Sequence, residues 1–122
     1  MTTTAARLVT LVFGLILAAC SAAPVVTPAV PGGIPLVASG TAFDRTTLEV
    51  PASRPFSLVF ENRDGAQHNV SITSAAGGAP VFTGEVFGGP AARVYAVPAL
   101  PAGRYTFRCD VHTEMTGALV SK

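Results

Sequence analysis

Residues 103–117 read GRYTFRCDVHTEMTG, and this stretch decides the fold class of the chain. Its first half alternates, with Tyr105, Phe107 and Cys109 on one side and polar or charged residues on the other, as in a half-buried β-strand. A short loop follows Cys109, and Gly117 lets the backbone enter the next strand. The stretch therefore predicts two strands joined by a loop that presents a cysteine at the end of a β-structure.

The loop is rich in side chains that are rare elsewhere in the chain. Cys109, His112 and Met115 lie within seven residues of one another. With His68 they comprise both histidines, the cysteine outside the first 20 residues, and the methionine besides the initiator. A thiolate, two imidazoles and a thioether form a soft, mixed ligand set. That set suits one copper ion, with two histidines and a cysteine in a trigonal plane and a weak axial methionine.

Each of these residues has a simpler explanation when it is considered alone. His68 could be a surface histidine and His112 an exposed loop residue. Cys109 could be a small buried hydrophobe, and Met115 could fill space in the core. These explanations weaken together, because four rare residue types would have to coincide by chance. Zinc is a less suitable occupant than copper, since a thioether is a poor zinc ligand.

The rest of the chain after residue 35 has strand patterns and no helical periodicity. Short runs rich in Val, Phe, Thr and Tyr are separated by Gly, Pro, Asn and Asp. Phe56, Leu58 and Phe60 alternate with other residues in the clearest of these runs. The pattern predicts an all-β fold, specifically an antiparallel Greek-key β-sandwich. The expected strands are 36–43, 47–50, 56–61, 68–73, 81–83, 92–97, 103–108 and 118–121.

The N-terminus has the pattern of an export signal. Arg7 precedes an apolar run, 8–19, of about a dozen residues, which is shorter than the roughly 20 that span a bilayer. The run ends in Leu-Ala-Ala-Cys at 17–20, which resembles the bacterial lipobox. That resemblance implies a signal peptide over residues 1–19 and a lipidated Cys20 as the first mature residue. An ordinary secretory signal cleaved after Ala22 or Ala23 is the alternative.

The segment that follows Cys20 is a predicted tether. Residues 20–35 contain several prolines, small residues and no charge, a composition typical of an extended, semi-rigid linker. A docked N-terminal strand is the alternative for its last few residues. One domain, residues 36–122, remains. The expected location is extracytoplasmic, as a membrane-anchored lipoprotein on the periplasmic or cell-surface face, and otherwise as a secreted or periplasmic protein. A disulfide between Cys20 and Cys109 is not expected, because Cys20 would carry the lipid and lies next to a flexible linker.

The charge of the chain gives no sign of a polyanionic partner. Eight Lys or Arg face seven Asp or Glu, and one of the basic residues, Arg7, lies in the signal segment. The remaining chain is formally neutral and contains no basic run, so nucleic acid is not an expected partner.

Two segments of the chain resemble the cupredoxins, the small blue copper proteins. Residues 60–70, FENRDGAQHNV, look like the family's N-x-D…H-N-V segment around the first histidine ligand. Residues 103–117 look like the family's G-x-Y-x-F-x-C-x-x-H…M-x-G segment. The C-x2-H-x2-M spacing is similar to the short ligand loop of the amicyanins, whereas plastocyanins have two more residues before the methionine. The resemblance implies the metal ligands His68, Cys109, His112 and Met115.

The resemblance also implies roles for residues beside the ligands. Asn69 looks like the residue that ties the two ligand segments and donates its backbone N–H toward the thiolate. Asp110 stands where many relatives have Ser or Thr, and it could accept from Asn69 while its charge lowers the reduction potential. Tyr105 resembles the tyrosine corner of Greek-key sandwiches. The chain departs from amicyanin-like loops at Val111 and Thr113, where relatives often have proline.

The resemblance implies an electron carrier that exchanges single electrons with redox protein partners, and we expect a monomer. The alternative function is a copper-binding module that captures or delivers the metal without electron transfer. An enzyme is not expected, because further catalytic copper ions would need additional histidines and both histidines are already used.

Overall fold

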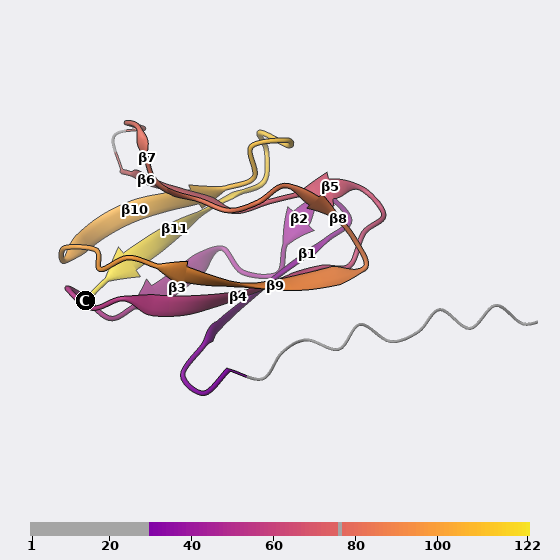
Figure 1. The fold of residues 1–122 in the computed structure, drawn as a ribbon. Coiled ribbons are helices and arrows are strands. Elements are labelled where there is room, and N and C mark those ends of the chain that lie inside the picture. Colours follow the sequence, from indigo (N-terminus) through magenta and orange to yellow (C-terminus); the bar gives the residue numbers. More distant parts are fainter. Residues whose placement is uncertain (1–29, 76) are drawn as a thin grey trace, which may run out of the picture.

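The computed structural model describes residues 30–75 and 77–122, and every regular element in these ranges is a β-strand. The predicted all-β sandwich is confirmed, and Figure 1 shows its two layers. The described residues contain no helix with the length and hydropathy needed to cross a membrane. The predicted signal segment 1–19, Cys20 and the tether up to residue 29 lie outside the described residues. The strands are, in order, β1 Ile34–Ser39, β2 Ala42–Phe43, β3 Thr47–Val50, β4 Phe56–Asn62, β5 Gln67–His68, β6 Ser71–Ser74, β7 Pro80–Thr83, β8 Phe87–Gly88, β9 Ala91–Val97, β10 Gly103–Arg108 and β11 Thr116–Ser121.

The strands form two sheets and a short ribbon. One sheet has the order β2-β1-β4-β9, the other has the order β3-β11-β10-β6-β7, and β5 pairs with β8. Most pairs are antiparallel, as predicted, but β1 pairs with β4 and β3 pairs with β11 in parallel. The chain leaves β1 and β2, passes through β3 in the other sheet and then returns to β4. Such a crossover brings the chain back to the same end of the sheet, which produces a parallel pair.

Several strand limits differ from the sequence prediction. The expected strand 36–43 is two strands, because the backbone turns at Gly40 and Thr41, which both have positive φ, 59° and 56°. Ile34 and Pro35, assigned to the tether, belong to β1, so the alternative of a docked strand describes them better. The expected strand 68–73 is divided into β5 and β6 by two residues, Asn69 and Val70. The two-residue strand β8 was not predicted.

The core lies between the two sheets, as the alternation predicted. Phe56, Leu58 and Phe60 of β4 are all buried, and Phe107 of β10 is fully buried. Aromatic rings connect the layers: the Phe43 and Phe107 centroids are 5.2 Å apart, and those of Phe60 and Phe87 are 5.7 Å apart. Such ring pairs add roughly 0.5–1.5 kcal/mol beyond the area they bury. The remaining members of the buried apolar cluster are Leu36, Ala38, Leu48, Val50, Val70, Ile72, Val97, Leu100, Cys109, Met115 and Leu119.

The two ends of β10 have different packing requirements. At its start, the Tyr105 hydroxyl donates to the carbonyl oxygen of Pro101 at 3.0 Å, which is the contact of a tyrosine corner. At its end, the ring of Phe107 lies over Gly117 of β11. A Cβ atom on Gly117 would be 2.2 Å from Cζ of Phe107, so only glycine fits beneath the ring. This close approach fixes β10 against β11 immediately before the loop that carries Cys109.

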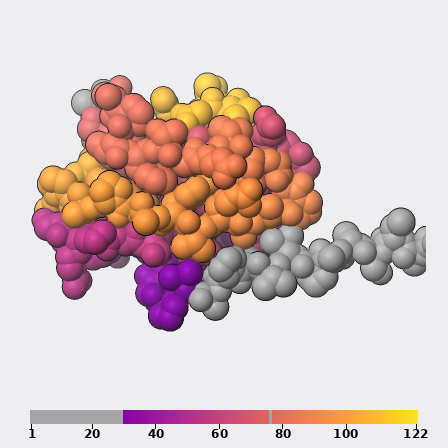
Figure 2. Space-filling view, in the orientation of Figure 1, coloured from indigo at the N-terminus to yellow at the C-terminus, as the bar shows by residue number. Residues whose placement is uncertain are grey.

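The register of β10 with β6 places the two conspicuous sequence segments side by side. Arg108, the last residue of β10, lies opposite Ser71, the first residue of β6. Because the pair is antiparallel, the residues after β10 lie next to the residues before β6, which include His68 and Asn69. In Figures 1 and 2, the yellow loop between β10 and β11 lies at the top of the domain, and the indigo start of the described chain lies at the bottom.

Candidate metal centre

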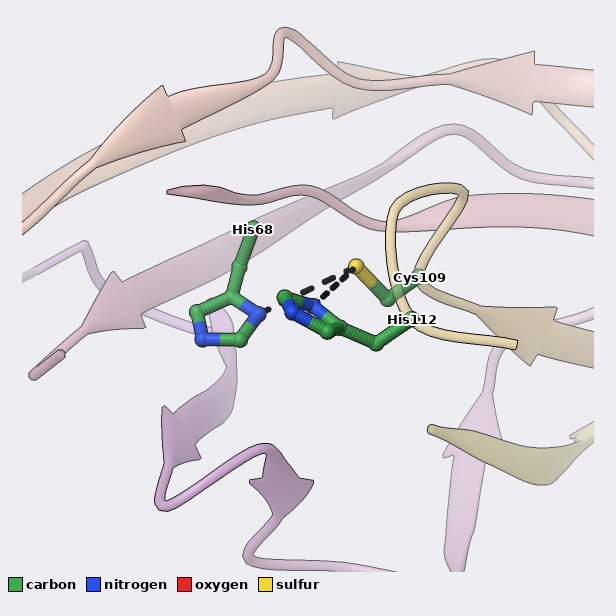
Figure 3. Close-up of side chains that lie close together, drawn as sticks. All are labelled: His68, Cys109 and His112. Atoms are coloured by element: carbon green, nitrogen blue, oxygen red, sulfur yellow. Dashed lines mark hydrogen bonds between the residues drawn. The ribbon is translucent and has the colours of Figure 1, made fainter. Parts of the chain in front are cut away.

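Three side chains with metal-binding atoms converge beyond the end of β10. One ligand atom from each of His68, Cys109 and His112 lies within 4.8 Å of the others. The Sγ atom of Cys109 is 3.9 Å from Nδ1 of His68 and 3.8 Å from Nδ1 of His112. Figure 3 shows both rings directed toward the sulfur, and the ring centroids are 4.7 Å apart. The structure thus brings together residues that are 41 positions apart in the chain.

The loop after β10 is closed by its own backbone. The N–H of Cys109 donates to the carbonyl oxygen of Met115 at 2.9 Å, and the N–H of Met115 donates to the carbonyl oxygen of His112 at 3.0 Å. These bonds bring both ends of the loop together, so that Cys109 and His112 face the same point. His68 enters from the other side at the end of β5, where it pairs with Phe87 of β8.

Burial differs among the four predicted ligands. His68, Cys109 and Met115 are buried, with exposed fractions of 0%, 1% and 2%. His112 is only partly buried, so it is the least enclosed of the four. Met115 belongs to the same buried cluster as Cys109. The centre is therefore closed to solvent except at His112.

The spacing of the three donor atoms fits a metal ion. Metal–nitrogen and metal–sulfur bonds of about 2.0–2.3 Å, arranged at 120°, would separate the donors by roughly 3.7 Å. The observed separations of 3.9 and 3.8 Å between Sγ and the two ring nitrogens are close to this value. A soft sulfur with two imidazole nitrogens is also a donor set that copper accepts in a trigonal site. The two separations that involve the sulfur therefore need little change to accommodate such an ion.

Asn69 and Asp110 connect the two ligand segments, as the sequence suggested for this pair. The side-chain oxygen of Asn69 accepts from the backbone N–H of Asp110 at 2.8 Å, and its amide donates to the Asp110 carboxylate at 2.8 Å. The amide also donates to the carbonyl oxygen of Gly84 at 3.1 Å. The hydroxyl of Ser71 donates to the same carboxylate oxygen of Asp110. The donation of the Asn69 backbone N–H to the thiolate stays a prediction.

A second carboxylate contacts the first histidine. Oδ2 of Asp64 lies 2.9 Å from Nε2 of His68, on the side of the ring opposite to the one that faces Cys109. The N–H groups of Gly40 and Thr41, in the turn between β1 and β2, donate to this carboxylate at 2.9 and 3.3 Å. The Asp64 carboxylate therefore connects the His68 ring to the turn between β1 and β2.

Both carboxylates have a pKa below the ordinary aspartate value. For Asp64, the hydrogen bond from the Gly40 N–H is the largest cause of the lowered pKa, and contacts with His68 and Thr41 add to it against the effect of burial. For Asp110, burial raises the pKa, but hydrogen bonds from Asn69 and Ser71 and the nearby Arg108 lower it by more in total. Two negative charges thus flank the centre at neutral pH.

Sequence reasoning missed the contacts of Asp64 and Ser71. The sequence indicates Asp64 only as the acidic residue of the N-x-D pattern, and Ser71 only as a residue of the expected strand 68–73. The spacing of four residues between Asp64 and His68 was the available signal. It was too weak to use, because the contact depends on a turn that also brings Gly40 and Thr41 to the carboxylate.

Comparison with known protein families agrees with this geometry. The family model described as a cupredoxin-like domain matches residues 8–121. The chain belongs to the cupredoxin-like domain family. No curated protein sequence matches this cupredoxin-like chain.

Solved structures of blue copper proteins share the fold of this cupredoxin-like domain. A dithionite-reduced auracyanin from the photosynthetic bacterium Roseiflexus castenholzii is 18% identical, with a TM-score of 0.65 over 75% of this chain and 97% of that one. Auracyanin A, a "blue" copper protein from Chloroflexus aurantiacus, is 22% identical, with a TM-score of 0.65 over 74% and 98%. A reduced amicyanin variant is 21% identical, with a TM-score of 0.60 over 77% and 86%. At these identities the similarity establishes the fold alone.

The bond between Asn69 and Asp110 should contribute measurably to the stability of the apoprotein. We expect a double-mutant cycle of Asn69→Ala and Asp110→Ala to give a coupling free energy of about 1 kcal/mol in denaturant unfolding. The value lies below the roughly 1.5–3 kcal/mol usual for hydrogen bonds to charged groups, because the Asp110 side chain is 33% exposed and water screens its charge.

The pair Arg108–Asp110 provides the matched control for this cycle. Its atoms are 3.3 Å apart, but the Arg108 side chain is 51% exposed, so we expect a coupling free energy below about 0.5 kcal/mol. A coupling for Asn69–Asp110 no larger than that of Arg108–Asp110 would contradict the view that the buried amide ties the ligand segments together.

Proposed function

We propose that this cupredoxin-like protein is an extracytoplasmic type 1 copper protein that carries single electrons between redox partners. One copper ion would be held by His68, Cys109 and His112, with Met115 as a weak axial ligand. The observation that carries the proposal is the convergence of two Nδ1 atoms on the buried Sγ atom, at 3.9 and 3.8 Å. The membership of the chain in the cupredoxin-like family and the blue copper proteins that share its fold support the choice of metal.

The rigidity of the centre favours electron transfer. A bound copper would supply a one-electron couple between Cu(I) and Cu(II). Cys109 is held by the strand pairing of β10 and by its bond to Met115, and His68 is held by Asp64. Because the ligands are fixed by backbone and buried hydrogen bonds, they need to move little when the charge of the ion changes. Small rearrangement on electron transfer lowers the barrier to that step.

The partly exposed His112 is the proposed point of electron entry and exit. It is the ligand that reaches the surface, whereas His68 and Cys109 are enclosed. Its neighbour Val111 is 47% exposed and gives this edge an apolar side chain, while Thr113 and Glu114 are exposed and polar. A redox protein that docks here would meet a mixed surface, in which Glu114 favours a partner with a basic residue at the contact.

We also propose that the protein is anchored to a membrane through a lipidated Cys20, with residues 20–33 as the tether. The LAAC motif at 17–20 supports this proposal. We expect mass spectrometry of the membrane-extracted protein to show an N-terminal peptide that begins at Cys20 and carries a lipid mass. A peptide that begins after Ala22 or Ala23 without lipid would contradict the anchor and support ordinary secretion.

The thiolate–copper bond should give the Cu(II)-loaded protein an intense visible colour. We expect a strong thiolate-to-copper absorption band in the wild type and its complete loss in Cys109→Ser, because serine has no sulfur atom from which charge can be transferred to Cu(II). Visible absorption with copper quantification by mass spectrometry measures both properties. Ser71→Ala is the control, since this residue contacts Asp110 and not the metal, and it should keep the band. A colourless wild type that contains one copper ion would overturn the proposal.

Electron self-exchange distinguishes the carrier from a module that delivers copper. The enclosed position of His68 and Cys109 favours slow release of the metal. We therefore expect rapid self-exchange, measured by nuclear magnetic resonance line broadening of mixed Cu(I) and Cu(II) protein, and slow transfer of copper to an apoprotein acceptor or a chelator. Slow self-exchange together with rapid metal transfer would favour copper capture or delivery instead.

A further inference from the structure

We propose that Asp64 is a positioning residue of the metal centre, which holds the His68 ring with Nδ1 toward Cys109 and, through its charge, lowers the reduction potential of the bound ion. The first part concerns the apoprotein and stands on the structure alone. The second part rests on the proposed function, because it needs copper in the site.

The contact between Asp64 and His68 selects one form of the imidazole ring. Oδ2 of Asp64 is 2.9 Å from Nε2 of His68. An ionised carboxylate only accepts hydrogen bonds, so Nε2 must carry the proton. A neutral ring with its proton on Nε2 has its lone pair on Nδ1, and Nδ1 is the atom 3.9 Å from Sγ of Cys109. The carboxylate therefore leaves Nδ1 with a free lone pair on the side of Cys109. Carboxylates beside other metal-binding histidines fix the ring in the same way.

Asp64 is itself held firmly from two other segments. The N–H of Gly40 donates to Oδ1 at 2.9 Å and the N–H of Thr41 donates to Oδ2 at 3.3 Å. On the backbone of Asp64, the N–H donates to the Asn62 side chain and the carbonyl oxygen accepts from the N–H of Gly89, both at 2.9 Å. These partners are backbone groups and a fully buried side chain. The orientation of the carboxylate thus does not depend on flexible surface residues.

Asp64 lies close enough to the centre for its negative charge to affect the reduction potential of a bound copper ion. The His68 side chain is 0% exposed and that of Asp64 is 22% exposed, so the interaction passes through the protein interior rather than through bulk water. A fixed negative charge stabilises the more positive Cu(II) relative to Cu(I). The sign follows directly: Asp64 lowers the reduction potential, and its removal raises the potential.

The apoprotein tests the positioning role without any metal. In the wild type we expect a hydrogen-bonded Nε2–H proton signal of His68, protected from exchange, with Nδ1 unprotonated in ¹⁵N nuclear magnetic resonance. In Asp64→Ala that protected signal should be lost. Asp44→Ala is the matched control: Asp44 accepts from the N–H of Val37 at 2.8 Å beside the same strand pair, and no bond joins it to His68. A protected Nε2–H signal that persists unchanged in Asp64→Ala would overturn the positioning role.

The copper-loaded protein tests the charge. We expect Asp64→Asn, which keeps an acceptor oxygen, to shift the Cu(II)/Cu(I) equilibrium about tenfold toward Cu(I), or about 59 mV upward for a one-electron couple. Asp44→Asn removes the same charge and should shift the potential by less than half as much. Equal shifts in the two variants, or no shift in Asp64→Asn, would overturn this part of the proposal.

The apoprotein experiment and the copper experiment can fail independently, so they also distinguish this inference from the proposed function. A wild type that gives no blue copper form would defeat the electron-carrier proposal, while the Nε2–H signal in the apoprotein would still decide the role of Asp64. If Asp64→Ala fails to fold, the His68 ring of the wild-type apoprotein decides: a proton on Nε2 and none on Nδ1 supports the positioning role, and a proton on Nδ1 alone contradicts it.

Discussion

The register between β6 and β10 is the constraint on which the rest of the structure depends. With Ser71 opposite Arg108, the end of one strand and the beginning of the other lie at the same edge of the sheet. A shift by one residue would turn Phe107 and Cys109 away from the core, because side chains in a strand alternate between the two faces. The packing of Phe107 over Gly117 and the contact of its ring with Phe43 oppose such a shift. Fold and site are therefore fixed by the same residues.

Two aspartates extend this rigidity to the ligands themselves. Asp110 connects the cysteine loop to Asn69, and Asp64 connects the first histidine to the turn between β1 and β2. The Asp64 carboxylate contacts the turn between β1 and β2 and the His68 ring, and the Asp110 carboxylate accepts from Asn69 and Ser71. Each carboxylate therefore joins its own loop to another part of the chain. Both also add negative charge near the centre. Structural support and the negative charge near the centre are thus provided by the same two side chains.

Much of this arrangement could be predicted from the sequence, because its signals are local. The alternation around Phe107 and the spacing of Cys109, His112 and Met115 contain the strand, the loop and the ligand types in 15 residues. The parallel pairs of β1 with β4 and β3 with β11 could not be predicted, since they depend on how the chain crosses between sheets. The role of Asp64 was hidden for the same reason: its partners Gly40 and Thr41 are more than 20 residues away in the chain.

The central claim is that one copper ion lies between two Nδ1 atoms and one sulfur. Anomalous X-ray scattering at the copper absorption edge, from crystals of the copper-loaded protein, tests it most directly. We predict a single strong peak within bonding distance of Nδ1 of His68, Nδ1 of His112 and Sγ of Cys109, with Sδ of Met115 farther away on the axis. A peak elsewhere on the protein, or one bound to the histidines without Cys109, would contradict the account.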